Sequence, residues 1–192
     1  MSYVKEYLWE LVPTNVPAIR RKCPKCGEKT DYISTGKFRV NANKSSIDIW
    51  LIYQCEKCKA SWNMDIYSRV KAGSLNEEEY KRFLANEEEL AKEYGFDIEI
   101  HNKNKVELRI KDISYYIKKV EILEENSEKD EVIIKIKCKY PCELRIDKIL
   151  ADNLNISRNR VKRMCEKGNI IGENNENLLK SKVEDGMIIH II

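Results

Sequence analysis

Two short cysteine pairs decide how the first part of this chain folds. The first is Cys23-Pro24-Lys25-Cys26-Gly27 and the second is Cys55-Glu56-Lys57-Cys58. Two residues between the cysteines of each pair allow both thiolates to turn back onto one ion, and Gly27 stands where such a turn needs a positive φ. Four thiolates complete a tetrahedral zinc shell with no open position, so we expect a structural zinc ion, with iron as the alternative metal. The predicted ligands are Cys23, Cys26, Cys55 and Cys58.

The 28 residues between the pairs predict a small sheet. Strands are expected at 37–40 and 47–53, joined by a polar turn over 41–46, and a third strand is expected at 60–64. Cysteine pairs at the ends of such a sheet are typical of a zinc ribbon. The alternative is a metal-free protein in which the reduced pairs merely pack, but so small a sheet needs a staple.

Composition bounds the remaining possibilities. The chain has 192 residues, of which 42% are apolar, and a net charge of +3, which is too small to indicate a nucleic-acid partner by itself. No apolar run approaches the roughly 20 residues of a membrane span, and the start of the chain does not resemble a signal peptide. We therefore expect a cytoplasmic protein with reduced thiols. The net charge is +6 over residues 1–75, −6 over 76–130 and +3 over 131–192, which suggests separate modules.

The chain resembles, over its whole length, a bacterial family of unknown function. The matching stretches are 38–44 (FRVNANK), 48–53 (DIWLIY) and Trp62-Asn63. The resemblance implies a ribbon followed by a helical middle and a basic C-terminal module, but it implies no activity.

The middle of the chain predicts a helix and then strands. Ser74-Leu75-Asn76 precedes three glutamates, which is typical of a helix start, and Gly95 is expected to end that helix. The acidic run 87–89 is interpreted as a solvated face, with a docking surface for a basic partner as the alternative. Strands are expected over 113–123, where helix is the alternative, and over 132–138, with a polar connection at 124–130.

The last 50 residues predict two helices and two short strands. A helix ending near Leu154 precedes a second helix over 158–167, which Ser157 caps and Gly168 closes. Strands are expected at 169–172 and 187–191. On the second helix, the apolar face carries Val161, Met164 and Cys165, whereas Arg160, Arg163 and Lys167 lie on another face.

This stretch resembles the small RNA-binding module named after the fourth protein of the small ribosomal subunit. The matching motifs are 145–150 (RIDKIL), 157–162 (SRNRVK), 166–170 (EKGNI) and Asp185-Gly186. The resemblance implies two helices on a small sheet and basic side chains that face structured RNA, reading its backbone and not its bases. The implied contact residues are Arg145, Lys148, Arg158, Arg160, Lys162 and Arg163. Residues 171–177 depart from the family's tight turn and add two glutamates, so the alternative is a degenerate module kept for packing.

Together these patterns predict an α+β protein in four consecutive segments: a zinc ribbon (1–70), an acidic helical segment (71–104), a β segment (105–140) and the RNA-binding-like module (141–192). Cys138, Cys142 and Cys165 are interpreted as core residues, with a second metal pair as the alternative for the first two. His101 and His190 have no recognisable catalytic partner, so no enzyme is expected. The expected function is a non-enzymatic, zinc-containing binder of structured RNA of the ribosomal or transfer class. The expected partners are that RNA and either the ribosome or a protein, with no membrane and no small-molecule substrate. The alternative is a protein-interaction or regulatory adaptor with a vestigial RNA surface, or a thiol and zinc redox sensor.

Overall fold

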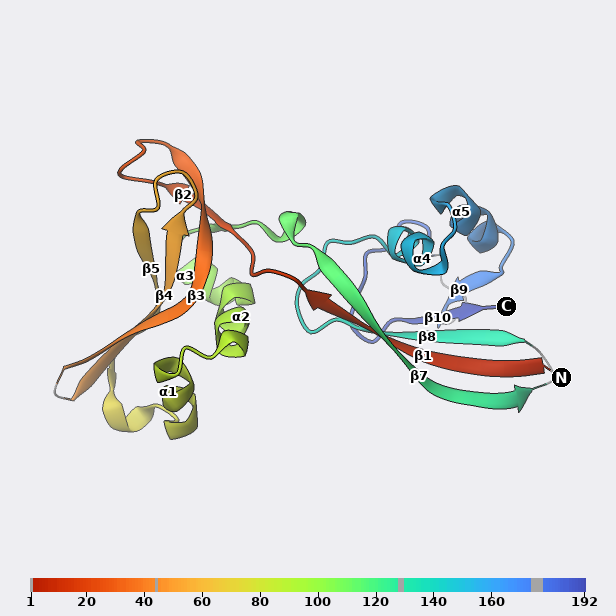
Figure 1. Ribbon diagram of the computed structural model, residues 1–192, viewed down its shortest axis with the longest axis horizontal. Helices are drawn as coiled ribbons and strands as arrows, with labels where there is room; N and C mark the ends of the chain where they lie inside the picture. Colours follow the sequence, from red (N-terminus) through yellow and green to blue (C-terminus); the bar gives the residue numbers. More distant parts are fainter. Residues whose placement is uncertain (1, 44, 128–129, 174–177) are drawn as a thin grey trace. The chain divides into compact units, whose positions relative to one another are not determined.

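The computed structural model describes residues 2–43, 45–127, 130–173 and 178–192 and places them in two compact units (Figure 1). The inserted unit is Asn15–Ile113, and the terminal unit combines Met1–Thr14 with Ser114–Ile192. This organisation differs from the four consecutive segments that the sequence predicts. The reason is that residues 2–13, expected in the ribbon segment, form a strand that pairs with strands more than a hundred residues later.

The inserted unit is built on an antiparallel five-stranded sheet of order β5-β4-β3-β2-β6. The alternation of apolar and polar residues in the fourth strand buries Ile49, Leu51 and Tyr53 completely, as a strand with one covered face requires. The expected polar turn over 41–46 is mostly strand, and Lys44 lies outside the described residues. The strands are β2 (Ile19–Lys22), β3 (Lys29–Asn43), β4 (Ser46–Cys55), β5 (Ser61–Lys71) and β6 (Glu107–Leu108).

Three short helices, α1 (Glu77–Leu84), α2 (Glu88–Phe96) and α3 (Ile98–Lys103), and two 3-10 turns, Ala72–Ser74 and Ile110–Asp112, complete this unit. The helix start at Asn76 is confirmed, since its side chain accepts a hydrogen bond from the Glu79 amide at 3.0 Å. The single helix expected up to Gly95 is interrupted, because Asn86 adopts a positive φ of 52° and its side chain accepts a hydrogen bond from the Phe38 amide.

Gly95 does not end a helix, which corrects the sequence prediction. It lies inside α2, which continues to Phe96. A Cβ atom at this position would stand 2.2 Å from Cγ1 of Val16. The glycine therefore allows close packing between α2 and the segment that precedes β2. The same core holds Phe83 of α1 edge-on against Phe38 of β3, with ring centroids 4.8 Å apart.

The terminal unit is built on a mixed sheet of order β7-β1-β8-β10-β9, in which β1 and β8 are parallel and the other neighbours are antiparallel. The predicted strand over 113–123 is confirmed, but it extends to Ser127 and takes in much of the expected polar connection, of which residues 128 and 129 lie outside the described residues. The strands are β1 (Ser2–Pro13), β7 (Tyr115–Ser127), β8 (Glu131–Lys137), β9 (Ile170–Gly172) and β10 (Ile188–Ile191).

Two helices, α4 (Ile146–Leu154) and α5 (Arg158–Glu166), cover one face of this sheet (Figure 1). Asn155, with a φ of 54°, ends α4, and Ser157 caps α5 by accepting a hydrogen bond from the Arg160 amide at 3.2 Å. Val161, on the predicted apolar face of α5, is completely buried. The turn that departs from the RNA-binding family includes residues 174–177, which lie outside the described residues. Among the described helices, none combines the length and apolar character that crossing a lipid bilayer requires.

Candidate metal centre

Both cysteine pairs lie in hairpin turns at one end of the inserted sheet. We call residues 23–28, between β2 and β3, the first knuckle, and residues 55–60, from the last residue of β4 to the start of β5, the second knuckle. The register pairs Lys22 with Lys29 below the first knuckle and Gln54 with Ser61 below the second. Because Tyr32 of β3 is paired with Cys55 of β4, the two turns lie at the same end of the sheet.

The two knuckles share one backbone pattern. In the first, the Cys23 amide donates to the Glu28 carbonyl at 2.8 Å and the Gly27 amide donates to the Cys23 carbonyl at 2.9 Å. In the second, Cys55 donates to the Ala60 carbonyl and Lys59 donates to the Cys55 carbonyl, both at 2.9 Å. The residue after each second cysteine has a positive φ, 77° at Gly27 and 60° at Lys59. The sequence signals this conformation at the glycine but not at the lysine.

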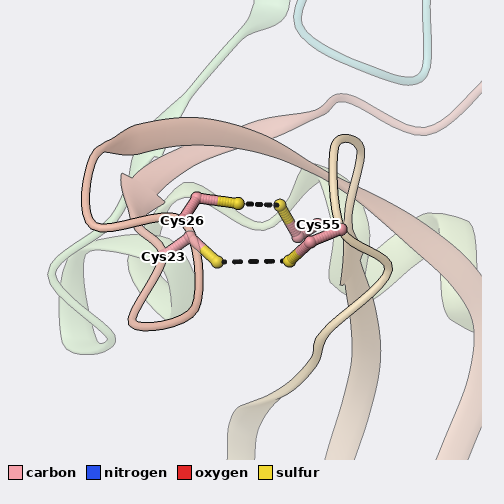
Figure 2. A group of neighbouring side chains, drawn as sticks. Cys23, Cys26 and Cys55 are labelled. Carbon is pink, nitrogen blue, oxygen red and sulfur yellow. Dashed lines mark hydrogen bonds between the residues drawn. The ribbon is translucent and has the colours of Figure 1, made fainter.

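The four cysteine sulfurs form one cluster, with all Sγ atoms within 4.8 Å of one another (Figure 2). The Sγ atoms of Cys23 and Cys58 are 3.6 Å apart, and those of Cys26 and Cys55 are 3.9 Å apart. Sulfurs bound tetrahedrally to one ion at about 2.3 Å lie roughly 3.8 Å from each other, so this spacing is compatible with a metal site. Within the part of the chain that the structure describes, no other group of three or more His, Cys, Asp or Glu side chains comes together in this way.

The thiols of this cluster differ in acidity. A hydrogen bond from Tyr32 lowers the pKa of Cys23 to about 6, whereas the hydrogen bond with Cys58 raises the pKa of Cys26 to about 12. Burial opposes ionisation of Cys55, but hydrogen bonds from Thr30 and backbone amides hold the pKa of Cys55 below its ordinary value. Without a cation, ionisation of one thiol therefore suppresses ionisation of its neighbour. A metal ion would remove this conflict by pairing with all four thiolates.

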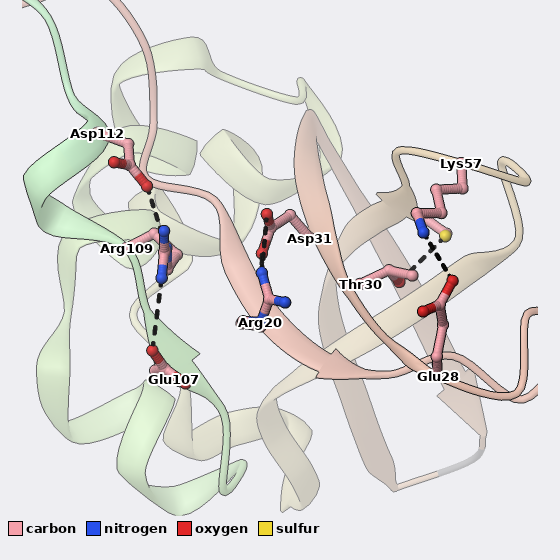
Figure 3. A network of polar contacts seen from close by, with 9 residues as sticks. Arg20, Glu28, Thr30, Asp31, Lys57, Glu107, Arg109 and Asp112 are labelled. Carbon is pink, nitrogen blue, oxygen red and sulfur yellow. Dashed lines mark hydrogen bonds and ion pairs between the residues drawn. The ribbon is translucent and has the colours of Figure 1, made fainter.

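Ion pairs hold the strands and turns around the cluster (Figure 3). Lys57 of the second knuckle binds Glu28 of the first, with Nζ and Oε1 2.6 Å apart. Arg20 and Asp31, opposite each other on β2 and β3, form a pair at 3.2 Å. Both pairs are solvent-exposed or half-exposed, so water and salt screen them and each contributes little to stability. They align the knuckles, while the cluster itself depends on the thiols.

All six residues predicted to contact RNA are exposed and lie on α4, on α5 or at the start of α4. Two of them are engaged by Asp147, a buried carboxylate that the sequence did not single out. Arg145 Nε lies 3.0 Å from its Oδ1, and Arg158 Nη2 lies 2.7 Å from its Oδ2. Burial opposes ionisation of Asp147, but the two guanidinium groups hold its pKa below the ordinary value.

The remaining four differ in their partners. Lys162 forms a long pair with Glu166 at 3.7 Å on the same helix. Lys148, Arg160 and Arg163 have no carboxylate partner among the described residues. On α4 and α5 the structure therefore contains two kinds of cation. The anchored cations, Arg145 and Arg158, are bound by Asp147, and the unneutralised cations, Lys148, Arg160 and Arg163, have no carboxylate partner among the described residues.

The two histidines are held by local contacts. His101 is buried in α3, its Nδ1 lies 2.5 Å from the Asp97 carbonyl oxygen, and burial lowers its pKa. His190 of β10 lies 2.7 Å from the Glu131 carboxylate. Cys165 is half-buried, and burial raises its pKa.

Comparison with known proteins gives a family without an assigned activity. The model of a family described as a protein of unknown function, DUF1062, matches residues 40–176, which is well over half of the chain. The matched range holds the second cysteine pair and both α4 and α5, and it begins after the first pair. No curated protein and no solved structure matches the chain. The chain therefore belongs to the DUF1062 family of proteins of unknown function.

Proposed function

We propose that this protein is a non-enzymatic, zinc-containing binder of structured RNA, of the ribosomal or transfer class. Zinc would hold the inserted unit together, and the exposed cations of α4 and α5 would contact RNA phosphates. The observation that carries the RNA proposal is the set of side chains without a carboxylate partner among the described residues: Lys148, Arg160 and Arg163.

The geometry of the thiols supports zinc in a structural role. Four sulfurs at tetrahedral spacing fill the coordination shell and leave no position for water or substrate. Two knuckles at one end of a small antiparallel sheet support the proposal of a zinc ribbon. Zinc prefers this closed tetrahedral thiolate shell without any redox change, whereas iron in the same shell would add a redox centre for which the proposed function has no use.

The distribution of charge on α5 supports an anionic ligand. The first turn of this helix has no acidic residue and contains Arg158 and Arg160. Cations at a helix N-terminus face the positive end of the helix dipole, which costs a few tenths of a kcal/mol to about 1 kcal/mol each. Asp147 offsets this cost for Arg158, but no carboxylate among the described residues offsets it for Arg160. A phosphate would supply the missing negative charge.

The anchored pair and the unneutralised cations suggest different roles. Arg145 and Arg158 are oriented by Asp147, so they would present fixed donors beside the surface. Arg160 and Arg163 would neutralise phosphates and release counterions. Such contacts read the shape of a folded RNA and not its base sequence.

The test is salt-dependent binding of purified transfer RNA and ribosomal RNA to the metal-loaded protein. Wild-type affinity should fall steeply with salt, and the double variant Arg160→Glu/Arg163→Glu should lose about tenfold or more at low salt. The matched control Lys37→Glu/Lys111→Glu makes the same change of charge at exposed positions of the inserted unit and should bind nearly as well as wild type.

Failure of the wild-type protein to retain either RNA at low salt would reject the RNA proposal and leave the adaptor interpretation. An equal loss in both double variants would show that only the total charge matters. Sequencing of RNA that copurifies after gentle lysis would then name the RNA.

A further inference from the structure

Two more cysteines lie together in the terminal unit, apart from the four-cysteine cluster. Cys138 follows β8 and Cys142 precedes α4, with Lys139-Tyr140-Pro141 between them. Both are free thiols, and their side chains are hydrogen-bonded to each other. The loop is held in place by Tyr115, whose hydroxyl donates to the Pro141 carbonyl at 2.8 Å.

The two thiols have unequal environments. Cys138 is 8% exposed, its Sγ donates to the Tyr140 carbonyl at 3.1 Å, and its amide donates to Asp185 Oδ1 at 2.7 Å. Cys142 is half-buried, and its Sγ accepts the Leu144 amide at 3.4 Å. The hydrogen bond between the thiols lowers the pKa of Cys142 and raises that of Cys138. Cys142 is thus the more accessible and more readily ionised sulfur, which are the properties of an attacking thiol.

We propose that Cys138 and Cys142 form a redox-active dithiol that a small-molecule disulfide oxidises to an intramolecular disulfide. The Cys142 thiolate attacks one sulfur of the small disulfide, forms a mixed disulfide and releases one thiolate. That thiolate takes the proton of Cys138, whose sulfur then attacks Sγ of Cys142 and displaces the second small thiolate, which takes a proton from water. The protein gives up two electrons and two protons, and one small disulfide becomes two small thiols.

Packing of the apolar core alone would not require the two thiols of Cys138 and Cys142 to interact. Cys165 shows what an ordinary packed cysteine looks like in the same unit: it is half-buried against the core, burial raises its pKa, and no cysteine acts on it. The pair differs from Cys165 by the hydrogen bond between its two thiols. Cys165 is therefore the matched control for the pair.

The experiment treats the full, metal-loaded chain with glutathione disulfide and maps the products by mass spectrometry. Wild type should lose two hydrogens, and trypsin, which cuts after Lys137 and Lys139, should yield residues 138–139 linked to residues 140–145. Cys138→Ser should accumulate a glutathione adduct on Cys142, because nothing resolves the mixed disulfide. Cys142→Ser should form neither product, and Cys165→Ser should behave as wild type.

Three results would overturn the proposal: an unmodified Cys142 in wild type, a stable glutathione adduct on Cys142 in wild type, or a disulfide from either residue to another cysteine. A Cys138→Ser protein with no adduct would also reject the assigned order of attack. If a variant fails to fold, the peptide map of the wild-type protein alone still decides whether the linked peptides form.

Discussion

The two units of this chain reach a folded state by different means. The inserted unit is one continuous segment whose main strands follow one another as hairpins, and its four-cysteine cluster lies at the end of two of these hairpins. The terminal unit joins both ends of the chain, because β1 lies between β7 and β8, and it covers its sheet with two helices. Both units bury an apolar core, but the inserted unit assembles it from neighbouring hairpins with a proposed metal staple, while the terminal unit must first bring distant strands together.

The largest expected effect is the loss of the inserted unit on metal removal. A structural zinc contributes binding free energy that reaches about 10 kcal/mol in small zinc domains, and the inserted unit would lose this contribution with the metal. We expect a strong chelator to abolish amide-exchange protection over residues 15–113 and to leave protection in β1, β8 and α4. Hydrogen exchange read by mass spectrometry measures both units at once. An equal loss of protection in both units, or no loss in either, would show that the inserted unit does not depend on a metal more than the terminal unit does.

The second expected effect is a destabilisation of the terminal unit alone, by substitution of Trp9. Its ring is 3% exposed, and its strand pairs it with Lys119 on one side and Ile136 on the other. Trp9→Ala should cost about 3–5 kcal/mol, because it empties a large buried volume. The same exchange experiment should show faster opening of the terminal unit and an unchanged inserted unit. Trp50→Ala, at a half-buried site in β4, is the control and should spare the terminal unit.

The third effect is a pH dependence that belongs to Asp147. Its folded pKa is lowered, so its contribution to the free energy of unfolding is present above the unfolded pKa and is lost as pH falls through the folded value. The wild-type terminal unit should therefore weaken below about pH 4. Asp147→Asn should lose on the order of 2 kcal/mol at neutral pH, less than a fully buried pair because both arginines are half-exposed.

Urea unfolding at several pH values measures this contribution. The curves of the wild type and of Asp147→Asn should converge in acid, where the wild-type carboxylate is protonated as well. A constant difference between the two proteins from neutral pH down to pH values far below the ordinary range of a carboxyl would contradict the assignment to this ion pair.

The smallest expected effects are changes in the free energy of unfolding from substitutions at the positive-φ residue of each knuckle. Gly27→Ala should cost about 1 kcal/mol, because alanine disfavours a positive φ although the added Cβ meets no atom within 4 Å. Lys59→Gly removes the same strain from the second knuckle but adds freedom to the unfolded chain, so it should stabilise by about 0.5 kcal/mol. Unfolding of the metal-loaded variants provides the measurement. Destabilisation by both substitutions would show that the knuckles are not equivalent.

Features with local sequence signals could be predicted. The spacing of the cysteines indicated the cluster, and the caps Asn76 and Ser157 placed two helix starts. The strand pattern of residues 47–53 also agreed with β4.

Features that depend on distant partners could not be predicted. Strand β1 was missed because its partners begin more than a hundred residues later, and because Leu8 and Val12 on its second face are also half-buried, which obscures the alternation. The break at Asn86 and the role of Gly95 depend on contacts with Phe38 and Val16, which no local pattern shows. The burial of Asp147 between two arginines likewise appears only when α4 and α5 meet.

The metal content and coordination of freshly purified protein test the proposed structural zinc site most directly. Elemental analysis should find one zinc per chain, and X-ray absorption at the zinc edge should show four sulfur ligands at about 2.3 Å. Cys165→Ser should leave both results unchanged, whereas Cys23→Ser should lose the metal or replace one sulfur ligand. Clearly less than one zinc per chain, iron in its place, or a shell with fewer than four sulfurs in the wild type would contradict the account.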